Sequence, residues 1–159
     1  MKKLAKEIIA ITALSLVLGT ALNFSLVRRF FKGEFRQGFI DREKYPDIRF
    51  ITLAEAEDLF SRGQEAGVFI DSRRREDFAA GHVPRSMSIP LDEHKKGLPD
   101  GTLAFPSGQI LVVYCEGGDC QTSTALAKLI QAKGFQDVRI FSGGWAEWSA
   151  AGLPAEGSR

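Results

Sequence analysis

The chain has 159 residues, 44% of them hydrophobic and 26% charged, which suits one folded domain with an additional segment. Its formal net charge of +1 gives no sign of a nucleic-acid partner, and we expect none. Two cysteines are too few for a disulfide-held scaffold, and the two histidines lack a metal-ligand spacing to them. We therefore expect neither a metal nor a cofactor.

Residues 8–27 form an uncharged run with charged residues on both sides. A helix of that length would span about 30 Å, the thickness of the hydrocarbon core of a bilayer. We predict a single-pass membrane anchor in residues 1–29. The alternative is a cleaved signal peptide, although the apolar run continues past the small residues 19–21. Basic residues are balanced across the run, so the side of the membrane stays undecided, and we favour the extracytoplasmic side only slightly.

After a juxtamembrane linker at 30–47, we predict one domain at 48–155 and a short tail at 156–159. Apolar and β-branched runs predict short strands, and caps with helical spacing predict helices between them. The strands are expected at 48–51, 68–70, 87–89, 111–114 and 138–141. The helices are expected from 52 to about 63, then at 75–80, 123–133 and 145–151. This alternation predicts an α/β fold, a parallel sheet with helices on both faces.

Cys115 directly follows the predicted strand 111–114 and is separated from the next helix by a short loop. Gly117 and Gly118 allow that loop to be tight. A thiol in such a place faces backbone N–H groups and the positive end of a helix, which favours the thiolate. A free cysteine is often only a small buried side chain. The position of Cys115 nevertheless favours chemistry, and we predict that it is a nucleophile.

The stretch Cys-Glu-Gly-Gly-Asp-Cys from Cys115 resembles the active-site loop of the rhodanese-like domain family. Other parts of the chain between about Ile48 and Pro154 resemble further signatures of that family: Asp71-Ser72-Arg73, Gly81-His82-Val83-Pro84, Ser88-Ile89-Pro90, and Gly143-Gly144-Trp145 with Trp148. The resemblance implies a rhodanese-like parallel sheet. For the signature residues outside the loop we favour structural roles: Asp71 pairs with Arg73, His82 is a turn residue with a bonded ring, and Trp145 and Trp148 belong to the core.

The resemblance also implies that Cys115 takes a sulfane sulfur from a donor, holds it as a persulfide, and passes it to a thiol or protein acceptor. Backbone amides would form the anion cradle around it, from Glu116, Gly117, Gly118, Asp119, Cys120 and Gln121. Many active members carry an arginine where this chain has Cys120, and Glu116 and Asp119 add negative charge to the loop. Thiosulfate is therefore expected to be a poor donor.

Three functions remain open from the sequence. The one we favour is a membrane-tethered sulfurtransferase that uses a Cys115 persulfide with a low-charge or protein-bound donor. The second is a dithiol–disulfide redox or sensor module in which Cys120 is the resolving thiol. The third is a rhodanese-like binding domain without catalytic activity.

Overall fold

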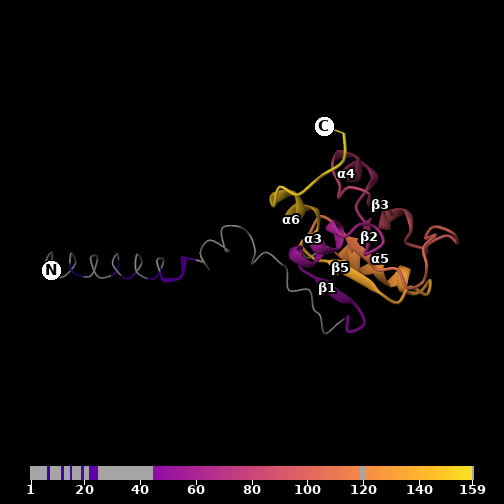
Figure 1. Ribbon diagram of the computed structural model, residues 1–159, viewed down its shortest axis with the longest axis horizontal. Helices are drawn as coiled ribbons and strands as arrows, with labels where there is room; N and C mark the ends of the chain where they lie inside the picture. The colour runs from indigo at the N-terminus through magenta and orange to yellow at the C-terminus, as the bar shows by residue number, and fades with distance from the viewer. Residues whose placement is uncertain are drawn as a thin grey trace. The chain divides into compact units, whose positions relative to one another are not determined.

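The computed structural model describes residues 7, 12, 15, 19, 22–24, 45–118 and 121–158 (Figure 1). The chain divides into two compact units, residues 1–36 and 37–159. The predicted anchor at 8–27 and the linker at 30–47 lie largely outside the described residues; within the anchor, Thr12, Ser15, Gly19, Leu22 and Phe24 are helical. Among the residues that the structure describes, no helix has the length and apolarity needed to cross a bilayer.

Five parallel strands form one sheet in the order β1-β5-β4-β2-β3. Their bounds are β1 (Arg49–Ile51), β2 (Val68–Asp71), β3 (Met87–Ser88), β4 (Leu111–Tyr114) and β5 (Val138–Phe141). β4 lies in the middle, between β2 and β5, and all four of its residues are buried. The predicted α/β fold with a parallel sheet is confirmed.

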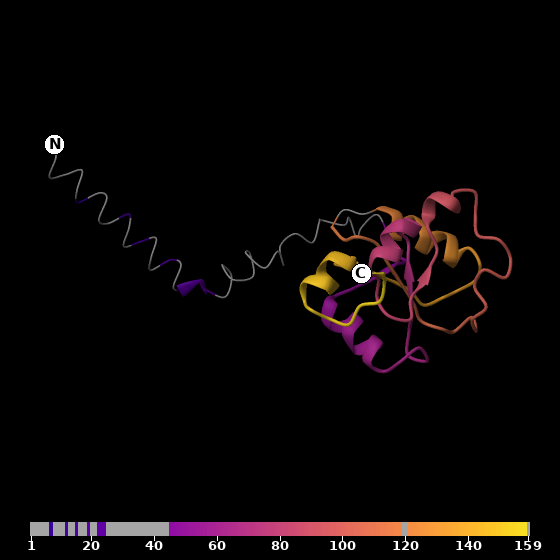
Figure 2. The ribbon, with the colours of Figure 1, turned by 90° about the horizontal axis from the view of Figure 1, so that it is seen from above.

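Helices cover both faces of this sheet (Figure 2). They are α3 (Leu53–Ser61), α4 (Arg75–Ala80), the 3₁₀ turn η2 (Leu91–Glu93), α5 (Gln121–Gln131) and α6 (Gly144–Ala150). Because side chains alternate along a strand, Leu111 and Val113 of β4 pack in the cluster that contains α5. Val112 and Tyr114 pack in the opposite cluster, with α3 and with Trp148 of α6.

The start of each long helix shows how local sequence and tertiary contacts compete. For α3 the predicted cap is confirmed: the Thr52 hydroxyl accepts from the Glu55 amide, and the Glu55 carboxylate accepts from the Thr52 amide at 2.9 Å. For α5 the predicted start at Ser123 is wrong, since the helix begins at Gln121. Ser123 and Thr124 are buried within the helix, so these hydroxyl residues contact the domain interior instead of capping its end.

The carboxyl ends of parallel strands meet at one edge of a sheet, and this edge carries the residues of interest. Asp71 ends β2, Cys115 follows β4, and Gly143 follows β5. The last described residues run past this part of the domain: Glu156 forms an antiparallel bridge with His82, and the Ser158 amide donates to the Ala79 carbonyl at 2.8 Å.

Candidate active site

Cys115 lies directly after the central strand and is 2% exposed. It is disulfide-bonded in the structure. The chain has one other cysteine, Cys120, which lies with Asp119 outside the described residues. Of the predicted anion cradle, the structure therefore describes Glu116, Gly117, Gly118 and Gln121.

The first turn of α6 holds the beginning of the loop by its carbonyl groups. The Trp145 amide donates to the Cys115 carbonyl at 2.8 Å, and the Ala146 amide donates to the Glu116 carbonyl at 2.8 Å. Both peptides that follow these carbonyls are trans, so each N–H points opposite to its C=O. The amides of Glu116 and Gly117 are consequently turned to the side of the loop away from α6. Amides turned the same way in a tight loop form a site that suits an anion.

Two glycines make this contact possible, because the loop and the start of α6 approach backbone to backbone. Gly144 has φ +58°, and a Cβ there would collide with the Cys115 carbonyl oxygen and lie 2.7 Å from the Gly117 nitrogen. Gly117 has φ +123°, and a Cβ there would collide with the Gly143 carbonyl oxygen. L-residues with side chains rarely adopt these φ values. Glycine at 117 and 144 is therefore required by both conformation and space.

Arg73 and Asp71 form a buried ion pair beside the loop, as predicted. Arg73 Nη2 lies 2.7 Å from Asp71 Oδ2, and Arg73 Nε lies 3.1 Å from both carboxylate oxygens. Asp71 is fully buried and Arg73 is 8% exposed. Arg73 Nη2 also donates to the Gly81 carbonyl at 2.6 Å. Burial alone would lower the pKa of Arg73, but its bonds to Asp71 and Glu116 outweigh this and raise it.

Arg73 also reaches the loop itself. Its Nη1 donates to Glu116 Oε2 at 3.1 Å, and the guanidinium lies over the Trp145 ring, 5.2 Å from its centroid. The sequence places Glu116 as an added negative charge in the loop, whereas the structure pairs that charge with Arg73. Sequence reasoning missed this contact because the two residues are far apart in the chain.

His82 and Trp148 have the structural roles predicted for them, whereas Trp145 differs in part. The His82 ring is stacked on Phe78, with centroids 3.7 Å apart, and its Nδ1 lies 2.7 Å from the Phe78 carbonyl. Trp148 is fully buried and donates from Nε1 to the Pro154 carbonyl at 2.7 Å. Trp145 is only partly buried, and a Cβ at Gly81 would lie 2.7 Å from its ring. Trp145 thus belongs to the surroundings of Arg73 as much as to the core.

Ser72 is a site residue that sequence reasoning overlooked. Its amide and its hydroxyl both donate to the Tyr114 carbonyl, each at 2.9 Å, at the peptide that leads into Cys115. The same hydroxyl lies 3.0 Å from that of Thr122 in α5. Ser72 therefore joins the end of β4 to the start of α5. Its position inside the Asp71-Ser72-Arg73 signature is the sequence feature from which this role could have been predicted.

Tyr114, the last residue before Cys115, is held by its hydroxyl group. Burial, and then the negative charge of Asp71, raise the pKa of this phenol well above its usual range. The hydroxyl accepts from the Val83 amide at 3.1 Å and lies 3.0 Å from the Ser86 hydroxyl. The end of the central strand is thus held both by the carbonyl and by the hydroxyl of Tyr114.

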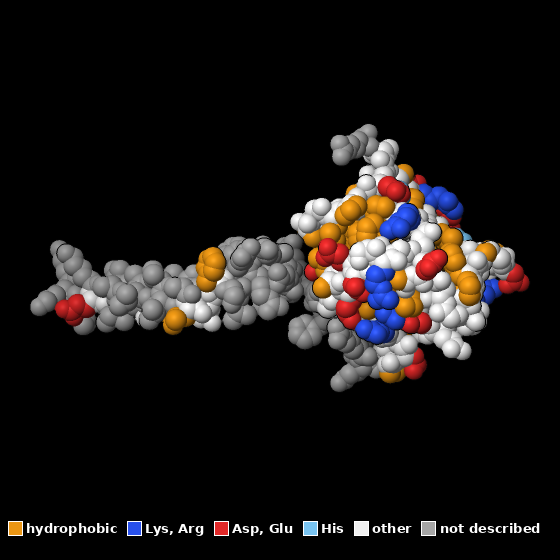
Figure 3. Space-filling model, viewed as in Figure 1, with side chains coloured by type: hydrophobic (Ala, Val, Ile, Leu, Met, Phe, Trp, Pro, Cys, Tyr) orange, Lys and Arg blue, Asp and Glu red, His pale blue; other side chains and the backbone are white. Residues whose placement is uncertain are grey.

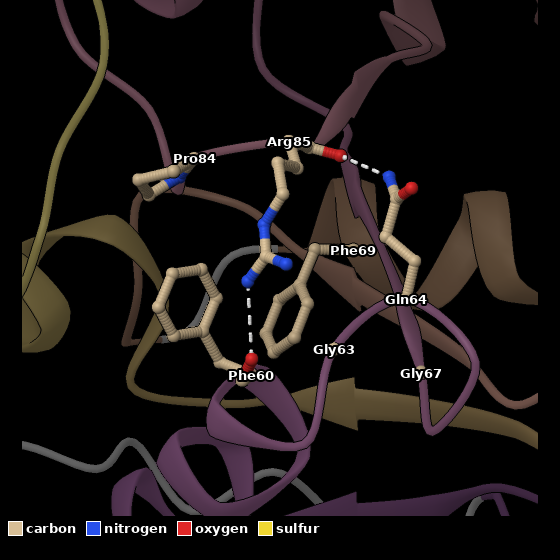
Figure 4. Close-up of a pocket in the computed structure, with 7 residues that line it drawn as sticks. All are labelled: Phe60, Gly63, Gln64, Gly67, Phe69, Pro84 and Arg85. Carbon is tan, nitrogen blue, oxygen red and sulfur yellow. Dashed lines mark hydrogen bonds between the residues drawn. The ribbon is translucent and has the colours of Figure 1, made fainter.

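A small hollow lies at the opposite edge of the sheet, before the strands β2 and β3 begin (Figure 4). It encloses about 190 Å³ including space open to solvent, and Phe60, Gly63, Gln64, Gly67, Phe69, Pro84 and Arg85 line it. The Arg85 guanidinium lies over the Phe60 ring at 4.7 Å and donates to the Phe60 carbonyl at 3.1 Å. The side chain of Arg85 is thus fixed against the wall of the hollow, and we interpret this arrangement as packing.

The visible face of the domain carries basic and acidic side chains close to one another (Figure 3). This interspersion agrees with the near-zero net charge of the sequence. The loop that begins at Cys115, at the end of the central strand, is the part of the described structure best suited to chemistry.

Comparison with known proteins defines the class of this domain. The sequence model of the rhodanese-like domain matches residues 52–151, and the chain belongs to this family. It is 30% identical over 111 residues to the HTH-type transcriptional regulator Rv0324 of Mycobacterium tuberculosis, over 65% of this chain and 47% of that protein. It is 32% identical over 90 residues to the rhodanese domain-containing protein CG4456 of Drosophila melanogaster, over 50% of this chain and 79% of that protein.

A solved structure is similar to this domain in its fold. The crystal structure of the BH2092 protein from Bacillus halodurans is similar with a TM-score of 0.62 and 25% identity, covering 74% of this chain and 82% of that chain. The chain spans about half the length of the mycobacterial regulator.

Proposed function

We propose that this chain is a membrane-tethered sulfurtransferase that carries sulfane sulfur as a persulfide on Cys115. The observation that carries the proposal is the orientation of the loop. The carbonyls of Cys115 and Glu116 are bonded to α6, which turns the following amides to the opposite side. Amides in this arrangement stabilise a thiolate or a persulfide anion next to the strand end.

The reaction has two displacement steps. In the first, the Cys115 thiolate attacks the outer sulfur of the donor, a new S–S bond forms, and the donor's leaving group departs with the electron pair of the broken bond. In the second, a nucleophilic acceptor attacks the outer sulfur of the persulfide, and Cys115 leaves as the thiolate. No external base is needed where the loop amides already favour the thiolate.

We expect Cys115→Ser to abolish sulfur transfer while the domain stays folded, because the change removes the nucleophilic sulfur and little volume. The measurement starts from reduced protein, follows thiocyanate formation with cyanide as acceptor, and records intact mass, in which a persulfide adds about 32 Da. Cys120→Ser is the matched control, since it removes the other thiol and should keep transfer. A sulfur adduct on the Cys115→Ser protein would refute the assignment.

A second candidate function is a dithiol–disulfide redox or sensor module, and the disulfide on Cys115 favours it. Attack by the Cys120 thiol on the inner sulfur of a Cys115 persulfide would release hydrosulfide and leave a disulfide between the two cysteines. Intact mass separates the candidates: after addition of a sulfur donor to reduced protein, a sulfurtransferase accumulates the heavier persulfide. A redox module instead loses about 2 Da relative to the reduced protein.

The proposed tether is the uncharged run at 8–27. We expect the full chain to stay with membranes after an alkaline carbonate wash, and Leu18→Arg to weaken this retention, because a charge at the centre of a spanning helix costs about 2.5–3.5 kcal/mol. The intact mass of the membrane-bound protein tests cleavage, since a signal peptide would leave a shorter chain. Protease treatment of intact and lysed cells then assigns the side on which the domain lies.

A further inference from the structure

Glu116 adjoins the nucleophile and covers Arg73 from the solvent side. The Glu116 side chain is 62% exposed, whereas the Arg73 side chain is 6% exposed, and the two join through Nη1 and Oε2 at 3.1 Å. One partner of this ion pair is thus buried and the other lies at the surface. The contact between them thus joins the buried guanidinium to a side chain at the surface.

The remaining donors of Arg73 are bound deeper in the domain. Nε and Nη2 donate to Asp71, and Nη2 also donates to the Gly81 carbonyl. The Trp145 ring covers the face of the guanidinium. Because Nη1 is the guanidinium nitrogen that is bonded to a surface residue, we assign it as the donor that an anion arriving from solvent would bond, and Glu116 competes for it through an N–H of Nη1.

We propose that Glu116 determines which sulfur donors reach Cys115, by occupying Arg73 Nη1 and so withholding this cation from anionic donors. With Asp71, Arg73 and Glu116 together, the group carries two carboxylates against one guanidinium. This excess negative charge repels an anionic donor such as thiosulfate. It does not repel a donor without negative charge, such as an uncharged persulfide held by a protein. The identity of the donor rests on the function proposed above, but the effect on charge does not.

The test uses three methanethiosulfonate reagents that differ in charge: the neutral methyl, the anionic sulfonatoethyl and the cationic trimethylammonioethyl compounds. Each transfers its alkylthio group to a thiolate and releases methanesulfinate, which carries away the electron pair of the broken S–S bond. Reduced protein with Cys120→Ser leaves Cys115 as the reacting thiol. The ratio of anionic to cationic rates then reports local charge and is independent of the thiol pKa, because the thiolate fraction is common to both reagents.

We expect Glu116→Gln to raise the ratio of anionic to cationic rates by about three- to tenfold, the effect of one charge a few ångström away near solvent. Glu116→Ala should raise it further, because alanine leaves Nη1 open whereas glutamine still bonds it. Glu65→Gln is the matched control: it removes an exposed carboxylate that precedes β2, at the other edge of the sheet, and should leave the ratio unchanged.

An unchanged ratio in both Glu116 variants overturns the proposal. Equal gains in the two variants overturn the part assigned to Arg73, since the carboxylate would then act by its charge alone. Thiosulfate:cyanide transfer is measured on the same proteins and should rise in the order of the ratio. If the ratio shifts as expected while none of the proteins transfers sulfur from any donor, the proposed function fails and the control of charge by Glu116 stands.

Discussion

Arg73→Gln is expected to destabilise the domain by about 3–5 kcal/mol, because it leaves a buried carboxylate without its counter-charge. Asp71 is fully buried, so water cannot replace a lost partner. Three of the hydrogen bonds that its carboxylate accepts come from the Arg73 side chain. The change also removes the bond to the Gly81 carbonyl. A loss of this size is a large part of the stability of an ordinary domain.

Urea unfolding of wild type and variant measures the loss in free energy of unfolding, provided that this free energy falls with urea concentration at the same slope in both proteins. The informative control is Asp71→Asn combined with Arg73→Gln, which removes both charges and should be more stable than Arg73→Gln alone. If the single variant unfolds within about 1 kcal/mol of wild type, the pair is not the buried electrostatic unit that its geometry indicates.

Local sequence specifies most of the elements that present the site. The bounds predicted for β4, β5 and α4 agree with the structure, since short apolar runs and helix spacing are read within a few residues. The position of Cys115 after the central strand follows from the same reasoning. The start of α5 does not, because Ser123 and Thr124 have cap-forming side chains that tertiary packing buries instead.

Contacts between distant segments could not be predicted in this way. The Arg73–Glu116 pair joins residues 43 apart, and it exists because β2 and β4 are neighbours that end at the same edge. The sequence shows Gly144 as one of two adjacent glycines and gives no reason to single it out. Its role emerges only when α6 is placed against the Cys115 loop, since the neighbouring carbonyl then excludes a side chain.

Gly144→Ala is expected to destabilise the domain by about 3–4 kcal/mol and to impair sulfur transfer at matched folding. About 1–2 kcal/mol is the cost of placing a side chain in the left-handed backbone region, where Gly144 has φ +58°. The rest comes from the collision between the new Cβ and the Cys115 carbonyl, which can be relieved only by moving the start of α6 away from the loop. That movement breaks the hydrogen bonds that the Trp145 and Ala146 amides donate to the loop carbonyls, so the proposed anion cradle loses its orientation.

Gly152→Ala separates the two causes. Gly152 has φ +70°, close to that of Gly144, yet no atom lies within 4 Å of the position a Cβ would take. It should therefore show the backbone cost of about 1–2 kcal/mol and keep sulfur transfer. Urea midpoints give the two losses, and transfer rates under conditions where both variants are folded give the effect on the site. Equal losses in the two variants, with equal activity, would mean that α6 can leave the Cys115 carbonyl without disturbing the cradle, and that the loop orients its amides by itself.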